Sequence, residues 1–107
     1  MTVLRVCYKS GIRFDDAYYL GTHCPLAAGV FGRHGLRQAE MVKVSASGDG
    51  STPPYQVIFS AYFDSAAALQ EAMGDPRMSG VIDDIRNFYD GMPDLLIGET
   101  VALPAPA

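Results

Sequence analysis

The chain has 107 residues, of which 49% are hydrophobic and 19% charged, so it can bury one core but not two, and it is too apolar to be intrinsically disordered. Its 8 lysines and arginines against 12 aspartates and glutamates give a formal net charge of -4 and form no basic cluster. Nucleic acid and anionic membrane surfaces are therefore not expected as partners. We expect a single domain over residues 1–107.

The two cysteines, Cys7 and Cys24, are too few for a disulfide framework and form neither a C-x-x-C pair nor a zinc-binding pattern. The first residues lack the features of a secretory signal, and no apolar run approaches the length of a membrane-spanning helix. These observations predict reduced thiols and a cytoplasmic protein.

The chain is predicted to begin with a strand followed by a helix. Residues 2–9 are rich in β-branched, aliphatic and aromatic types, as is typical of a strand. Asp15 and Asp16 place negative charge in the first turn of a helix. The helical pattern continues to about Phe31, after which glycines end it.

Two further strands are predicted in the middle of the chain. Apolar and polar residues alternate over residues 36–47, and the turn-forming residues at 47–54 predict an exposed hairpin loop. Residues 55–63 are apolar in one strand phase and largely apolar in the other, so both faces of this strand are expected to be covered.

A second helical region and a last strand complete the pattern. Ser65 or Asp64 is expected to cap a helix over residues 66–73, which breaks at Gly74-Asp75-Pro76 and resumes to about Phe88. Alternation over residues 94–103 predicts the last strand, and the prolines of residues 104–107 predict a frayed tail.

The order strand, helix, strand, strand, helix, strand is that of an α+β, ferredoxin-like domain with a four-stranded antiparallel sheet. Both helices then lie on one face of the sheet. Because two of the strands are apolar in both phases, the other face would expose a contiguous apolar surface in a monomer. We therefore expect a homodimer in which two sheets pack face to face and form a barrel.

The stretch around His23 carries the most distinctive chemistry. Tyr19, His23, Leu26 and Val30 have the spacing of one helical face, so a side chain that titrates near neutral pH is placed on the side that packs inward. Pro25 lacks an N–H and frees the carbonyl of residue 21, which predicts a bend or restart of the helix near His23. The imidazole is then a general acid or base, a ligand, or a packing residue with satisfied hydrogen bonds.

Other side chains are candidates for the same cavity. Tyr19 either donates a hydrogen bond to a substrate oxygen or packs on the sheet, and Glu99 either lies in a paired position or orients His23. Cys24 lies about 100° around an α-helix from His23 and is expected to act as a small apolar residue. Tyr8, Tyr62 and Leu26 are further candidates for substrate binding.

The remaining charged and metal-binding residue types are given no functional role by the sequence. Asp83, Asp84 and Arg86 have the pattern of a solvated helix face with local ion pairs. Histidines and carboxylates do not occur at metal-site spacing, so a bound metal is not expected.

Three segments give the chain a resemblance to the EthD family: Phe14-Asp15-Asp16 before Tyr18-Tyr19, His23-Cys24-Pro25-Leu26, and Asp84-Ile85-Arg86-Asn87-Phe88. The resemblance covers nearly the whole chain and implies the dimeric α+β barrel fold. The family's namesake is associated with ether degradation beside a haem monooxygenase system, and relatives of this fold include small isomerases and monooxygenases. One departure is Cys24, where methionine is common between the histidine and the proline.

Two classes of function follow. The first is a catabolic or tailoring enzyme for an apolar, aromatic or ether-derived molecule, in which His23 transfers a proton, or supports a cofactor-free oxidation, and Tyr19 stabilises an oxyanion. The second is a noncatalytic ligand-binding protein that serves a neighbouring oxygenase. No cofactor is expected in either class; haem held by His23 is the alternative.

Overall fold

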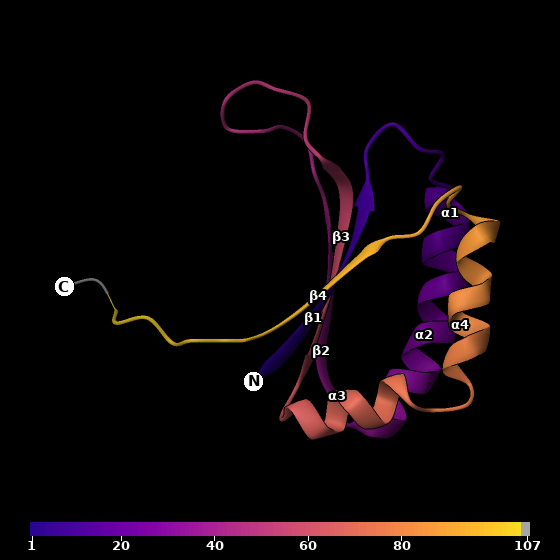
Figure 1. The fold of residues 1–107 in the computed structure, drawn as a ribbon, viewed down its shortest axis with the longest axis vertical. Helices are drawn as coiled ribbons and strands as arrows, with labels where there is room; N and C mark the ends of the chain where they lie inside the picture. The colour runs from indigo at the N-terminus through magenta and orange to yellow at the C-terminus, as the bar shows by residue number, and fades with distance from the viewer. Residues whose placement is uncertain (106–107) are drawn as a thin grey trace.

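A four-stranded antiparallel sheet with all helices on one face forms the body of the protein (Figure 1). The computed structural model describes residues 1–105, so part of the tail expected at residues 104–107 lies outside the described residues. The strands are β1 (Thr2–Lys9), β2 (Leu36–Lys43), β3 (Tyr55–Phe63) and β4 (Asp94–Glu99), in the order β2-β3-β1-β4. This is the predicted ferredoxin-like α+β arrangement.

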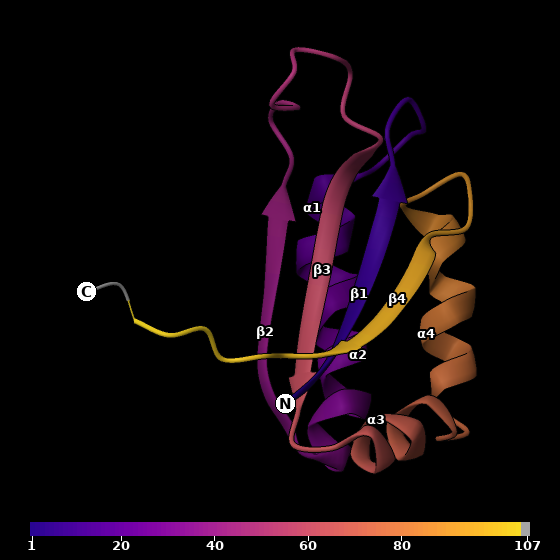
Figure 2. The ribbon, with the colours of Figure 1, turned by 60° about the vertical axis from the view of Figure 1, so that its left-hand side comes forward.

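Two helical connections, both on the same face of the sheet, join the strands. Between β1 and β2 run α1 (Asp16–Tyr18), the π-helix η1 (Tyr19–His23), α2 (Cys24–Phe31) and the 3-10 turn η2 (Gly32–His34). Between β3 and β4 run α3 (Ala66–Met73), α4 (Met78–Asp84) and the 3-10 turn η3 (Ile85–Asn87). Helix α4 runs alongside α2, and α3 crosses the end of the sheet where β3 finishes (Figures 1 and 2).

Side chains at the helix ends explain where the helices begin and stop. The carboxylate of Asp15 accepts a hydrogen bond from the N–H of Tyr18, and the hydroxyl of Ser65 accepts one from the N–H of Ala68, so each satisfies a free donor of a first turn. The first helical region ends at Gly35, whose φ of 80° is readily adopted by glycine.

The π-helix is the one irregularity that changes which residues face inward. The N–H of Cys24 bonds to the carbonyl of Tyr19, five residues back, and Pro25 follows without an N–H of its own. The predicted restart near His23 is therefore confirmed, but it takes the form of one extra residue in the turn. After it, Ala27 and Phe31 are buried where Leu26 was expected.

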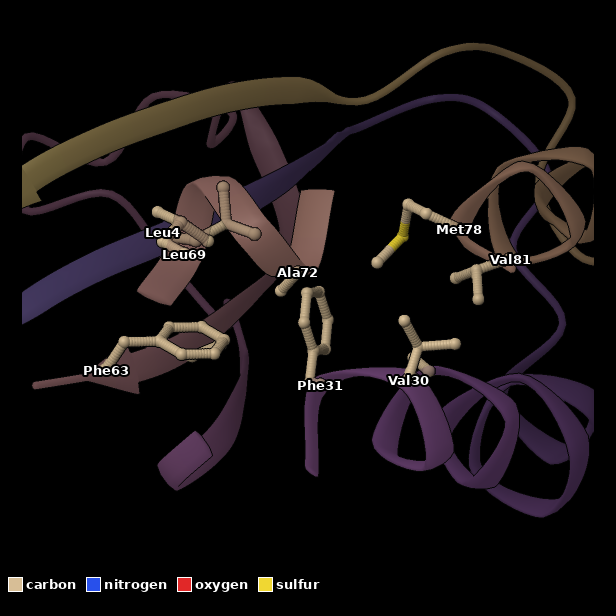
Figure 3. Packing of buried hydrophobic residues seen from close by; sticks show 10 residues of the cluster. Leu4, Val30, Phe31, Phe63, Leu69, Ala72, Met78 and Val81 are labelled. Carbon is tan, nitrogen blue, oxygen red and sulfur yellow. The ribbon is translucent and has the colours of Figure 1, made fainter. Parts of the chain in front are cut away.

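The register of the strands places Leu4, Val6 and Tyr8 of β1 on the helix-covered side, beside residues such as Phe59 and Ala61 of β3. Figure 3 shows Val30 and Phe31 of α2, Met78 and Val81 of α4, and Leu69 and Ala72 of α3 converging on this side. A second cluster of mainly aromatic residues, including Tyr8, Tyr19, Phe88 and Tyr89, lies at the opposite end of the sheet.

Two strands end earlier than predicted, because their partners end. Strand β4 pairs only with β1, whose first residue, Thr2, lies opposite Glu99, so the expected continuation to residue 103 has no partner. Strand β2 stops at Lys43, opposite Val57, rather than at residue 47; in this register residues 46 and 47 would extend past Tyr55, the first residue of β3. Within residues 1–105, the helices are all too short or too polar to traverse a lipid bilayer.

Candidate functional site

A cavity of about 120 Å³ lies between the helices and the sheet. It is walled by β1, β3 and β4 on one side and by η1, α2, α3, α4 and η3 on the other. Apart from His23, Cys24, Tyr8 and Tyr19, its walls are aliphatic, phenylalanine, proline and methionine side chains. A cavity of this order of size holds one aromatic ring.

His23 forms part of this wall and is only 6% exposed. Its ring stacks on that of Tyr19 at a centroid distance of 5.6 Å and lies against Phe88 at 4.5 Å. Its Nδ1 lies 3.0 Å from a carboxylate oxygen of Asp84. The imidazole is thus held between two aromatic rings and anchored through one nitrogen.

Asp84 is the centre of a small polar network. One of its oxygens accepts hydrogen bonds from the hydroxyl of Tyr18 at 2.5 Å and the amide of Asn87 at 3.0 Å, while the other faces His23. Burial alone would raise the pKa of Asp84, but the hydrogen bonds from Tyr18, Asn87 and His23 outweigh it, so the pKa lies below its usual value.

The charge of Asp84 determines which nitrogen of His23 is available. An ionised carboxylate only accepts hydrogen bonds, so Nδ1 of His23 must donate, and in the neutral ring Nε2 then carries a free lone pair. Throughout residues 1–105, every fully buried side-chain nitrogen or oxygen has a hydrogen-bond partner. Nε2 makes no hydrogen bond within the described residues and so is not fully buried, and His23 lines the cavity.

Two tyrosines line the same cavity. Tyr8 and Tyr19 are 2% and 1% exposed, and their rings meet edge to face at a centroid distance of 5.8 Å. Burial raises the pKa of both hydroxyls above the usual value of tyrosine. Both therefore stay protonated at neutral pH, which suits a hydrogen-bond donor.

Cys24 also lines the cavity, against the expectation that it lies on a different face from His23. The π-turn places Cys24 above Tyr19 rather than about 100° away from the inward face, because the turn holds one more residue than an α-turn. Burial raises the pKa of its thiol, and the Tyr19 hydroxyl is its neighbour. A neutral thiol is a weak nucleophile, so Cys24 serves as a wall residue.

Three predicted substrate-binding residues lie elsewhere. Leu26 is exposed because the π-turn rotates it away from the sheet. Tyr62 lies on the other sheet face, where its hydroxyl donates to Glu40 at 2.9 Å. Glu99 accepts from the hydroxyl of Thr2 at 2.6 Å; Thr2 is six residues along β1 from Tyr8, about 20 Å at strand spacing, so Glu99 does not orient His23.

Asp84, which orients His23, has the sequence pattern of a solvated helix face, so the sequence alone does not predict this role. A signal was nevertheless present, because Val81, Asp84 and Phe88 have the i, i+3, i+7 spacing of one helical side, and the first and last of them are buried. A carboxylate between two inward-facing apolar residues needs a partner, and a histidine on the adjacent helix supplies it.

The described residues contain no cluster of three or more histidine, cysteine or acidic side chains that would hold a metal ion. His23 and Cys24 are cavity residues of types that bind metals or haem iron: His23 would act through Nε2, whereas burial raises the pKa of the Cys24 thiol and disfavours the thiolate that binds metals.

Comparison with known proteins gives a consistent family. The family model described as the EthD domain matches residues 13–92. An EthD-like protein of Ralstonia eutropha is 28% identical, with 97% of this chain and 95% of that chain covered and a TM-score of 0.82. An ethyl tert-butyl ether D (EthD) family protein of Bacillus halodurans is 26% identical, with coverages of 94% and 99% and a TM-score of 0.77.

A more distant structure shares the fold. SnoaB of Streptomyces nogalater, a cofactor-independent oxygenase, is 13% identical over 99% of this chain and 95% of that chain, with a TM-score of 0.67. No curated protein matches the sequence.

Proposed function

Because the chain belongs to the EthD family, we propose that it acts on a small, apolar molecule and that His23 transfers a proton to or from it. The observation that supports this most strongly is the Asp84–His23 pair at the wall of an apolar cavity, with Nε2 of the imidazole free. A carboxylate that fixes the tautomer of a histidine is the usual way to make the other nitrogen a base.

The reaction class follows from the groups at the cavity. Nε2 of His23 removes a proton from a carbon next to a carbonyl group, or from a phenol, and the imidazolium that forms is stabilised by ionised Asp84. The negative charge that develops on the substrate oxygen is stabilised by a protonated tyrosine hydroxyl, from Tyr19 or Tyr8. Return of the proton to another atom of the substrate completes an isomerisation.

Oxidation is the second outcome of the same first step. A phenolate or enolate can transfer electrons to dioxygen without a metal. The likeness to SnoaB concerns only the fold and is not evidence for this reaction. In both outcomes the first step is the deprotonation by His23, and in the oxidation dioxygen is the co-substrate that accepts the electrons. Ether degradation, with which the family's name is associated, would need a partner enzyme for the cleavage of the ether.

Haem is not part of the proposal. Nε2 of His23 would be its axial ligand, but the cavity of about 120 Å³ is smaller than a porphyrin, and its walls are packed side chains from two layers. Absorption spectra of the purified protein are expected to lack a Soret band, and a Soret band that disappears in the His23→Ala variant would contradict this part of the proposal.

We propose that the protein works as a homodimer in which each subunit covers the other subunit's sheet face opposite the helices. This sheet face is the uncovered face. Leu96 of β4 and Val42 of β2 lie on this face and are 55% and 48% exposed. Ile58 lies on the same face, on β3, which is between β2 and β4 in the sheet. A second copy would remove these apolar side chains from water. The cavity lies on the other side of the sheet, so each subunit carries its own site.

The test uses an uncharged carbon acid with one ring. Phenylacetone exchanges its benzylic protons for deuterons in D₂O once a base forms the enolate, and proton NMR follows the loss of the signal. The wild-type protein is expected to accelerate this exchange over buffer, and His23→Ala to lower the acceleration by about 100-fold or more, the contribution typical of a general base.

The same experiment separates an enzyme from a carrier. A noncatalytic ligand-binding protein would bind phenylacetone without accelerating the exchange, and His23→Ala would change only its affinity. Phenols, anthrones and lactones screened against the wild type and the His23 variant extend the test to oxidation and ring chemistry. Exchange at the buffer rate with bound phenylacetone would contradict the proposed enzyme and leave the carrier.

A further inference from the structure

The cavity beside His23 opens through an apolar rim. Three of its lining residues, Ile82 of α4, Met92 before β4 and Leu95 of β4, are 43%, 64% and 51% exposed. Pro93 lines the cavity between the last two. Large apolar side chains of this kind normally lose most of their exposure on folding, so a contiguous exposed group at a cavity entrance marks a surface that binds something apolar.

The chemistry of the walls restricts what that molecule carries. No lysine, arginine, aspartate or glutamate is among the lining residues of the cavity, and its ionisable groups are His23, Cys24 and two tyrosines that stay protonated. An ammonium group of a ligand would thus lose its hydration without gaining an opposite charge. A carboxylate or phosphate would face only the ring of His23, whose positive charge is already balanced by Asp84 when the ring is protonated. The part of the ligand inside the cavity is uncharged.

The size of the cavity restricts the ligand further. About 120 Å³ accommodates one ring. The rim residues line this space with part of their surface and, at 43–64% exposed, present the rest to solvent outside it. A ligand that is only one ring in size would leave Ile82, Met92 and Leu95 exposed. A ligand with an apolar tail would cover them.

We infer that the substrate is amphipathic, with an uncharged, proton-donating ring that lies beside His23 and an alkyl or similarly apolar tail that lies across Ile82, Met92 and Leu95. The inference rests on the proposed function of the same site. The flexible methionines, Met73 and Met78 inside and Met92 at the rim, suit a chain that does not have one fixed shape.

The test measures the affinity of a series of 4-alkylphenols, from phenol to 4-pentylphenol, by isothermal titration calorimetry. Complete burial of a methylene group strengthens binding about fourfold, and a tail that is half covered by the rim gains about twofold per methylene. The dissociation constant of the wild type is therefore expected to fall by a factor in this range with each added carbon.

A pair of matched variants locates the tail. Leu95→Ser removes an apolar side chain from the rim and is expected to flatten the dependence of affinity on tail length while leaving the affinity for phenol itself nearly unchanged. Leu26→Ser is the control, because Leu26 is a similarly exposed leucine, 42% against 51%, outside the cavity lining. It should leave both quantities as in the wild type.

The results that would overturn the inference differ from those that would overturn the proposed function. Affinity that does not change with tail length, equal effects of Leu95→Ser and Leu26→Ser, or absence of binding by every alkylphenol would overturn the tail site. A normal tail-length dependence together with phenylacetone exchange at the buffer rate would support the tail site and remove the role of His23 as a base.

Discussion

Replacement of Asp84 by Asn removes the charge that fixes the His23 ring while keeping the shape of the side chain. In the wild type, Nδ1 of His23 lies 3.0 Å from the carboxylate, whose pKa is lowered by its hydrogen bonds. A hydrogen bond to a charged group contributes about 1.5–3 kcal/mol. If all of it is used to stabilise the imidazolium in the transition state, Asp84→Asn slows proton transfer by about 10- to 150-fold.

The amide adds a second effect that a direct measurement can detect. An asparagine can also donate to Nδ1, which would place the proton of the neutral ring on Nε2 and leave no lone pair for the substrate. Nitrogen-15 NMR of the imidazole reports which nitrogen is protonated, and phenylacetone exchange reports the rate. The wild type is expected to carry the proton on Nδ1, and the variant to lose that preference.

Asp83→Asn is the control for this experiment, since it makes the same change of charge on the preceding, exposed residue. The rate and the tautomer should then match those of the wild type. The reasoning about Asp84 would be refuted if Asp83→Asn and Asp84→Asn slowed the exchange equally, or if Asp84→Asn slowed it with the imidazole proton still on Nδ1 and phenylacetone no longer bound.

Three further predictions concern stability and assembly. The side chain of Asp75 is 2% exposed and binds Arg77 and His34, which hold its pKa below the usual value. Its contribution to stability is present above about pH 4 and lost as the pH falls further, so urea unfolding should show Asp75→Asn destabilised at pH 7 and the difference shrinking in acid. Gly35→Ala should cost about 1–2 kcal/mol of unfolding free energy in the same assay, because φ is 80° and an added Cβ meets no atom within 4 Å, which leaves backbone strain as the cause. Leu96→Asp places a charge on the uncovered face and should convert a dimer into a monomer in sedimentation experiments; a monomeric wild type would contradict the proposed dimer.

The fold could be predicted because its signals are local. Alternation over β1 and β3, the caps at Asp15 and Ser65, and the glycine at the end of the first helical region each depend on nearby residues. The ends of β2 and β4 could not be predicted as well, since a strand ends where its partner ends. The positions of these strand ends therefore depend on residues far away in the sequence.

The candidate site was only partly predictable. Pro25 indicates a break near His23, but nothing in the sequence indicates that the turn gains a residue, so α-helical spacing puts Leu26 on the face of His23 and Cys24 on a different face. The Asp84–His23 pair joins residues 61 positions apart and depends on how two helices pack side by side. Which of its two predicted roles Glu99 has could not be decided from the sequence, because that depends on the register of β4 against β1, which pairs Glu99 with Thr2.

The most direct test of the account is whether a small ring enters the cavity beside His23. Isotope-edited NMR of protein with labelled methionine methyl groups detects close contacts to the ring protons of bound phenol. We expect contacts to the methyl groups of Met73 and Met78, which line the cavity, together with a shift of the His23 ring nitrogen signals. Contacts confined to Met1 or Met41, or saturable binding that leaves the His23 signals in place, would contradict it.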